Sequence, residues 1–289
     1  MVLPEWTSRR LANGLRVDVA VHDGTPDAAI RLIVEAGAGT APASQAGLAT
    51  LAGELLVEGA AGRSSIAMAE WLDVLGASFH CRSTYDHAVL SMHTLTDQFS
   101  ESLEFLSAVT RSPDFEPREV QRVRDLRIDR IRRRNDEPGE IASDRLAEAV
   151  FGAHAYGAPL DGTLQSVEAL EADTLGSFWR ARVIPSAATL VVCGDVDPIE
   201  VFAVVEDRFG DWTAGGTAVE GVSSSVEKPV RSGDMLLVDR PASRQTELRI
   251  AGVGFARGAD GEIPALVMNA ILGGLFNSRI NLNLREDKG

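Results

Sequence analysis

Three residues of the stretch "GLATLAGELLVEG" (47–59) are candidates for chemistry on a single helix face. Leucines recur in this stretch at helical spacing, so the opposite face of the expected helix carries Thr50, Gly53 and Glu54. A threonine hydroxyl is a poor zinc ligand, and glycine has no side chain that can accept a proton. Of the three residues, only Glu54 supplies a charged group.

The histidines and cysteines form no metal-binding pattern. His80, His87 and His93 are close in sequence, but their spacing fits no zinc motif, and strand alternation places His80 on the opposite face from the other two. We interpret them as exposed or hydrogen-bonded strand residues. Cys81 and Cys193 are too few for a disulfide framework, and we interpret both as ordinary buried thiols.

A run of arginines follows Pro117 on a predicted helix. Such a run is able to bind nucleic acid, but a formal net charge of -14 argues against a nucleic-acid partner. We therefore interpret it as a solvated or internally paired face, with contact to another partner as the alternative. The run consists of Arg122, Arg124, Arg127, Arg130, Arg132, Arg133 and Arg134.

Composition and length predict a globular chain. With 289 residues, 45% of them hydrophobic, the chain is able to form about two domains. Its first residues lack the apolar core of a signal peptide, and no later run approaches the roughly 18 apolar residues of a membrane span. The sequence as written thus predicts no membrane span and a cytoplasmic location, or a periplasmic one where a leader has been removed.

Strand-like and helical patterns alternate along most of the chain. The helix that carries Glu54 is expected to begin at a Ser44 cap and to end at Gly59. We expect strands at 14–22, 28–37 and 188–196, a hairpin at 77–95, and helices at 44–59, 64–77, 97–112, 117–134, 142–152, 166–183 and 198–212.

The C-terminal part has an unfinished pattern. After a stretch rich in Gly and Ser, two strands are expected at 234–240 and 245–255, followed by a helix at 263–274. So few residues would struggle to stabilise a separate core. We expect the strands to pair as neighbours, to open a second domain, and to belong to a longer subunit.

Five motifs in a fixed order carry a family resemblance. They are "LANGLRV", "GLATLAGELLVEG", "HAYGAPLDGT", "LVVCGDVDPIE" with "FGDW", and "AILGGLFNSRINLNLREDKG". With these motifs the chain resembles the pitrilysin/insulinase family of zinc peptidases, and best the group of mitochondrial processing peptidase and its bacterial relatives. The resemblance implies an α+β fold: a two-layer domain over 1–215 with a mostly antiparallel sheet covered by helices, a linker at 216–232, and the incomplete start of a similar domain at 233–289.

The resemblance also implies a degenerate metal site. In the family, an H-x-x-E-H helix supplies two zinc-binding histidines and a glutamate base. Here Thr50 and Glu54 stand at the histidine positions and Gly53 at that of the base. The third ligand falls at Asp129 or Arg130, which the spacing does not separate. Glu54 and Asp129 together would suit a hard cation better than zinc.

The function implied is that of a non-catalytic, substrate-binding subunit. It would pair with an H-x-x-E-H-bearing subunit, enclose a peptide substrate with it, and carry no cofactor of its own, because the zinc is expected on the partner. The alternatives are a structural or assembly protein and a metallopeptidase with a shifted metal site.

One arginine of the last motif is a substrate-binding candidate. Arg285 matches an arginine that, in non-catalytic bacterial subunits of the family, works with a tyrosine to hold the substrate. Arg279 is a weaker candidate. The alternative for Arg285 is a simple ion pair with Glu286 or Asp287.

Overall fold

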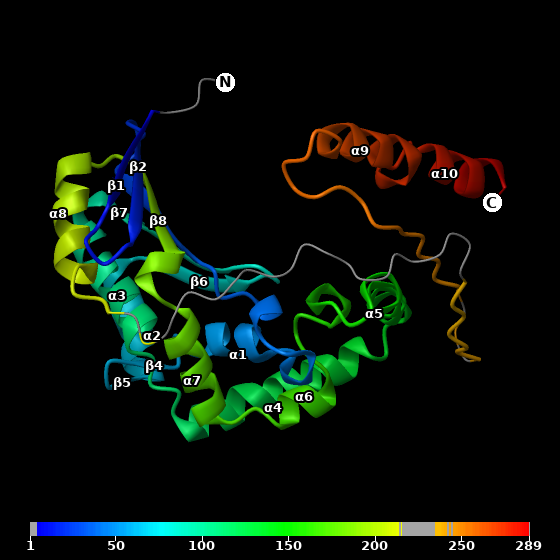
Figure 1. Ribbon diagram of the computed structural model, residues 1–289, viewed down its shortest axis with the longest axis horizontal. Helices are drawn as coiled ribbons and strands as arrows, with labels where there is room; N and C mark the ends of the chain where they lie inside the picture. Colours follow the sequence, from blue (N-terminus) through cyan, green and yellow to red (C-terminus); the bar gives the residue numbers. More distant parts are fainter. Residues whose placement is uncertain (1–4, 214, 216–234, 242, 244, 289) are drawn as a thin grey trace.

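The computed structural model describes residues 5–213, 215, 235–241, 243 and 245–288. The expected linker at 216–232 lies outside the described residues. Figure 1 shows a sheet with helices against its left side, a second group of helices below it, and a separate helical run at the C-terminal end.

The sheet has six strands and is mostly antiparallel, as expected. Its order is β1-β2-β8-β3-β7-β6, and only the β2–β8 pair is parallel. Strand β8 comes late in the first domain but lies between β2 and β3, so the centre of the sheet joins segments far apart in the sequence. The strands are β1 (Trp6–Arg10), β2 (Arg16–Val21), β3 (Asp27–Val34), β6 (Ser78–Ser83), β7 (Ala88–Leu95) and β8 (Ala188–Gly194).

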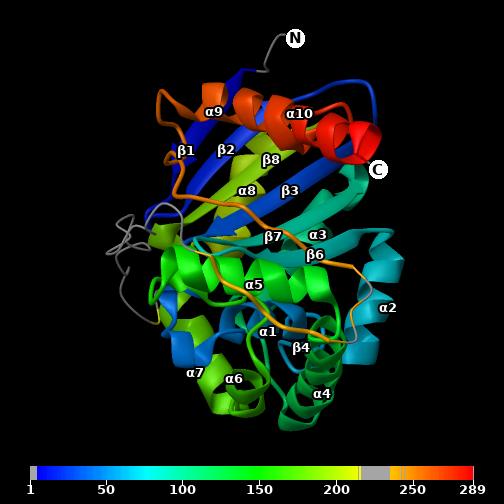
Figure 2. The ribbon, with the colours of Figure 1, turned by 90° about the vertical axis from the view of Figure 1, so that its right-hand side faces the viewer.

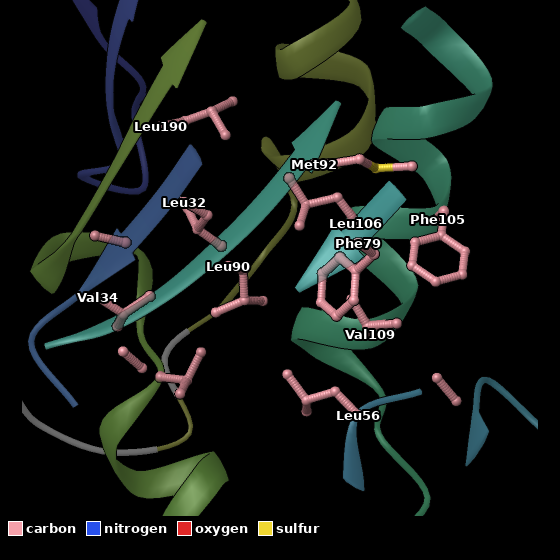
Figure 3. Packing of buried hydrophobic residues seen from close by; sticks show 14 of the residues in the cluster. Leu32, Val34, Leu56, Phe79, Leu90, Met92, Phe105, Leu106, Val109 and Leu190 are labelled. Atoms are coloured by element: carbon pink, nitrogen blue, oxygen red, sulfur yellow. The ribbon is translucent and has the colours of Figure 1, made fainter. Parts of the chain in front are cut away.

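One face of the sheet is apolar and covered by helices. Alternate residues of β3, such as Ile30 and Leu32, are fully buried there, because successive strand side chains point to opposite faces. Helices α3 (Phe99–Arg111) and α8 (Pro198–Phe209) pack on this face. Figure 3 shows Phe79 of β6 beside Phe105 of α3, with their ring centroids 5.5 Å apart, and the strand leucines, including Leu32, in the same cluster. The α+β two-layer prediction is thus confirmed.

A second group of helices lies below the sheet and contains the candidate site. Helix α1 packs against α7, α4 and strand β6, and α4 packs against α6. Figure 1 shows this group under the β6 edge of the sheet. The remaining helices and strands are α1 (Leu48–Leu55), β4 (Gly59–Ala60), β5 (Arg63–Ser64), α2 (Ser65–Leu75), α4 (Pro117–Arg134), α5 (Pro138–Phe151), α6 (Leu164–Glu168) and α7 (Ala172–Arg182).

Several helix boundaries differ from the sequence prediction. Helix α1 ends at Leu55 rather than at Gly59, which lies in β4, and α5 begins at Pro138 rather than at residue 142. Helix α1 begins at Leu48, after Gly47 with φ 93°, rather than at a Ser44 cap, because residues 43–45 form a separate 3-10 turn. The helix expected at 166–183 is divided, since Thr163 caps α6 and Glu171 is extended (φ -111°, ψ 159°) before α7 begins.

The predicted faces of the hairpin histidines were wrong. His80 pairs with Ser91, so His80 and His93 are exposed on the same face of the sheet. The alternation of side chains between the two faces of the sheet does not continue from β6 into β7, because the loop at 84–87 joins the strands without keeping that alternation. His87 lies in that loop and is also exposed.

The C-terminal part contains the expected helix but not the expected strands. Among the described residues of 235–255, none forms a strand. A strand requires a hydrogen-bonding neighbour, whereas this segment touches the first domain through side chains: Arg240 donates to the Asn135 and Asp136 carbonyls, and Arg249 to the Ser143 hydroxyl. The adjacent pairing predicted for 234–240 and 245–255 is therefore absent from the described residues.

The C-terminal helical run is longer and more apolar than predicted. It comprises α9 (Glu262–Asn269), a π-helical turn at Ala270–Gly274, α10 (Arg279–Asn281) and a second π-helical turn at Leu282–Asp287. By length and composition alone, the run Glu262–Asp287 would be able to cross a membrane. The sequence alone predicts no such run, because polar but uncharged residues such as Asn269 divide its apolar stretches; core helices of globular proteins can have the same length and composition.

Candidate functional site between helices α1 and α4

Helix α1 presents Thr50 and Glu54 towards helix α4. Its leucines are buried on the core side, which fixes the rotation of the helix. At its start, Gly47 has a positive φ, and a β-carbon there would lie 2.8 Å from the Asp161 carbonyl oxygen. Glycine at this position therefore brings the segment around Asp161 against the first turn of α1.

A buried guanidinium lies at the centre of the site. Arg127 of α4 is 1% exposed, and its Nη2 lies 2.8 Å from Glu54 Oε2. Its Nη1 donates to Thr50 Oγ1 at 2.9 Å and lies 3.2 Å from Asp161 Oδ1. One arginine thus joins helix α1, helix α4 and the loop before α6.

The other hydrogen bonds of Thr50 fix its hydroxyl. The single hydroxyl proton of Thr50 is shared between two backbone carbonyl oxygens, those of Gly47 at 2.9 Å and Leu160 at 3.0 Å. Since the hydroxyl oxygen also accepts from Arg127, the hydroxyl is fully used inside the protein.

The structure separates the two candidates for the third ligand position. Arg130 Nη1 donates to Glu54 Oε1 at 2.9 Å, so Arg130 belongs to the site. Asp129 points elsewhere and pairs with Arg132 at 3.1 Å. The hypothetical cation site formed by Glu54 and Asp129 is therefore wrong, because neighbouring residues on a helix face different directions.

The position of Gly53 is packed against strand β6. A β-carbon on Gly53 would lie 2.8 Å from the Cys81 sulfur and 3.5 Å from the Ser83 hydroxyl. Ser83 Oγ in turn donates to the Ala49 carbonyl at 3.0 Å. Cys81 and Cys193 were predicted to be ordinary buried thiols, and both are free cysteines that are partly buried.

The charges of the site act on its titratable groups. Burial raises the pKa of the Glu54 carboxyl, but the charge of Arg127 and hydrogen bonds from Arg127 and Arg130 outweigh this and lower the pKa below its ordinary value. Burial, together with the Glu54 charge, raises the pKa of the Cys81 thiol to about 12. Glu54 is thus held ionised and Cys81 is held protonated at neutral pH.

These side chains do not suit a zinc ion. Zinc sites use neutral imidazoles, thiolates or free carboxylates, whereas Glu54 is engaged by two guanidinium groups within 3 Å. Among the described residues, no group of three or more His, Cys, Asp or Glu side chains is arranged to hold a metal ion. The positive charge of Arg127 would repel a divalent cation at this place.

The structure does not bring Arg285 or Arg279 into this site. Both lie on the C-terminal helical run, which Figures 1 and 2 show apart from α1. Arg285 is exposed and forms no ion pair within the described part of the chain, so the predicted pairing with Glu286 or Asp287 is absent.

Sequence analysis missed Arg127 and Asp161 as members of the site. Arg127 was treated as one residue of a basic run, although its spacing of three from Arg130 places both on one helix face. That spacing was the available signal. The prediction of internal pairing holds for most of the run: Arg122 pairs with Glu58, and Arg134 with Asp144.

Comparison with known proteins assigns two family regions to the chain. The family described as insulinase, peptidase family M16, matches residues 17–164, and the peptidase M16 inactive domain matches residues 169–289. The fold agrees: a crystal structure of a peptidase M16 inactive domain from Pseudomonas fluorescens superposes with a TM-score of 0.84 at 23% identity, covering 99% of this chain and 68% of that chain.

Curated relatives are longer than this chain. A protein of Mycobacterium leprae, named as an uncharacterized zinc protease, is 25% identical over 279 residues, which is 96% of this chain and 62% of that protein. The beta subunit of the mitochondrial-processing peptidase of Blastocladiella emersonii is 19% identical over 272 residues, which is 94% of this chain and 57% of that subunit. The chain thus spans less than two thirds of their length.

Proposed function

The chain belongs to the insulinase family, peptidase family M16, and we propose that it serves there as a non-catalytic, substrate-binding subunit. In this proposal it pairs with an H-x-x-E-H-bearing relative, which supplies the zinc, and the two enclose a peptide for hydrolysis. The observation that carries the proposal is the engagement of Glu54 by Arg127 and Arg130 at the place where the family binds its metal.

The family reaction needs groups that this site lacks. Zinc hydrolysis requires ligands that hold the metal and a base that takes a proton from the metal-bound water. Thr50 is fully hydrogen-bonded, and Gly53 has no side chain. Glu54 is held ionised, but its oxygens accept hydrogen bonds from guanidinium groups, so it is poorly placed to accept a proton from water.

The geometry disfavours a shifted metal site built on the same helix. That alternative relied on Glu54 and Asp129 acting together, and each is paired with a different arginine. The geometry instead favours a structural role for this site. The ion pairs of Arg127 fix the relative positions of α1, α4 and the segment at Asp161 without a metal. A surface fixed in this way suits a subunit that positions a substrate for its partner.

The test is reconstitution with an H-x-x-E-H-bearing homologue from the same host. Co-purification should recover that homologue, and zinc analysis should find the metal in the homologue and less than a stoichiometric amount in this chain. Peptide hydrolysis should require both chains and should be abolished by a chelator.

Two results would contradict the proposal. One is a full equivalent of zinc in the chain alone, with chelator-sensitive hydrolysis. The other is a stable complex with proteins unrelated to peptidases, which would favour the role of a structural or assembly protein.

A further inference from the structure

The face of the sheet opposite the helices is open and polar. In Figure 2 this face is turned towards the viewer, with α9 and α10 in front of part of it, and the strands appear in the order β1, β2, β8, β3, β7, β6. The register aligns Asp18, Val191, Arg31, Ser91 and His80 across neighbouring strands. Arg31 and His80 are exposed in this row.

Two arginines of this face have no ion pair among the described residues. Arg31 of β3 and Arg82 of β6 are both exposed, and neither forms an ion pair or hydrogen bond with any residue that the structure describes. Arg16, by contrast, pairs with Asp18 at 2.9 Å.

The carboxylates of the face are already engaged. Asp18 accepts from Ser8 in addition to Arg16, and Asp27 is hydrogen-bonded to His93 at 2.7 Å and to Thr25. The hydrogen bonds from Thr25 and His93 lower the pKa of Asp27. Within the described strands, the face therefore offers free guanidinium groups but no free carboxylate, and the exposed carboxylate nearest to β3 without an ion pair is that of Glu35, just past the strand's end.

A basic face is unexpected on a protein with a formal net charge of -14. We infer that the open face of the sheet binds an extended, acidic segment of a peptide, with Arg31 and Arg82 as the residues that select carboxylates. Guanidinium groups suit this task because their planar donors bond carboxylates in fixed geometry. This inference rests on the proposed function, since it names the class of substrate that the subunit would hold.

The distance between the two arginines predicts the distance between the acidic residues of a bound peptide. Arg31 is level with His80, which is two residues from Arg82 on β6, and β3 and β6 are separated by β7 alone. With strands about 4.8 Å apart and about 3.4 Å per residue, the two arginine α-carbons lie roughly 12 Å apart. About four residues of extended peptide cover that distance.

The experiment measures binding of short fluorescein-labelled peptides to the complete chain by fluorescence anisotropy. The probe is a Ser/Val peptide with two glutamates four positions apart, and its counterparts carry glutamine or lysine at those positions. The glutamate peptide should bind at least about fivefold more tightly than the glutamine peptide at low salt, and salt should reduce the difference. Equal binding of all three peptides would overturn the inference.

Paired substitutions test the assignment to these residues. Arg31→Gln with Arg82→Gln should abolish the preference for glutamate while leaving the melting temperature unchanged. The matched control is Arg118→Gln with Arg133→Gln, which removes the same charge from exposed positions of α4 and should preserve the preference. If the preference for glutamate is lost in both paired variants, or in neither, Arg31 and Arg82 are not the residues that select carboxylates.

Failure of the inference can be told apart from failure of the proposed function. A reconstituted complex that cleaves acidic and neutral peptides equally well would defeat the inference alone. A chain that selects glutamate peptides but never supports hydrolysis would defeat the proposed function and leave the binding face standing.

Discussion

At the scale of single residues, Arg127 takes the central place between α1 and α4. Arg127 and Arg130 both bond Glu54, but Arg127 is 1% exposed whereas the Arg130 side chain is 53% exposed. Removal of a buried partner leaves charges without compensation, and removal of an exposed partner leaves them to water. The two arginines therefore differ in energetic weight despite sharing one carboxylate.

Arg127→Met should destabilise the fold by about 2 kcal/mol, because Thr50, Glu54 and Asp161 lose a buried donor, while solvent partly screens Glu54 (33% exposed) and Asp161 (40% exposed). Arg130→Met is the matched control and should cost at most about 1 kcal/mol. Urea unfolding followed by circular dichroism measures both. Equal losses in the two variants would show that burial does not set the contribution of Arg127.

The lowered pKa of Glu54 predicts a dependence of stability on pH. Folding lowers this pKa below its ordinary value of 4.5, so the ion pairs stabilise the fold fully above that pH and less as pH falls through the folded-state pKa. Glu54→Gln should therefore reduce the free energy of unfolding at neutral pH, and the difference from the unchanged chain should shrink below about pH 4.

The control for this pH dependence is the same substitution made in the Arg127→Met background. The charge of Arg127 is the largest of the influences that lower the pKa of Glu54, so the pH-dependent difference should be much smaller there. A stability difference between the Glu54→Gln variant and the unchanged chain that stays constant across the acid range would contradict the assignment.

At the scale of elements, helix α1 meets strand β6 through a contact that only glycine permits. A β-carbon at Gly53 would lie 2.8 Å from the Cys81 sulfur. Gly53→Ala should therefore destabilise the fold by about 1–3 kcal/mol through overpacking, against a gain in helix propensity of about 1 kcal/mol.

A double-mutant cycle separates these two effects. Cys81→Ala removes the sulfur, so Gly53→Ala should become neutral or stabilising in that background, with a coupling free energy of about 1 kcal/mol or more between the sites. Chemical denaturation of the four chains measures the coupling. Additive effects would show that β6 shifts to accommodate the methyl group.

Local signals in the sequence were sufficient for most of the first domain. Pro117 begins α4, Ser64 caps α2, and Gly76 ends α2 in the left-handed conformation, as their preferences predict. These signals act within one turn of a helix. The hairpin at 77–95 was likewise predicted from alternation inside each strand.

Predictions failed where long-range contacts decide the result. The faces of His80 and His93 depend on the length of the loop between their strands, and the strands expected at 234–255 depend on neighbours for their hydrogen bonds. The prediction of the site was incomplete in part for the same reason. Arg127 and Asp161 are far from Glu54 in sequence, and no local pattern shows that the three meet.

At the scale of the whole molecule, the C-terminal helical run presents a large apolar surface. Leu266, Ile271, Leu275 and Phe276 are exposed among the described residues. Exposed apolar side chains that gather in one patch are typical of surfaces that contact protein or membrane. In the complex proposed above, the run would pack against the partner subunit, and Arg285 at its end would face the substrate.

Arg285→Ala tests this arrangement in the reconstituted complex. Arg285 is exposed and has no ion-pair partner in the described residues, so its removal should leave folding and assembly unchanged. Loss of one charge-assisted hydrogen bond to the substrate should lower kcat/KM for peptide cleavage about tenfold, equivalent to about 1.4 kcal/mol. The matched control is Arg257→Ala, which removes an exposed arginine from the turn before α9 and should leave cleavage within about twofold. Gel filtration establishes assembly before the kinetics are compared, and unchanged kcat/KM in an assembled Arg285→Ala complex would return Arg285 to the ordinary surface charges.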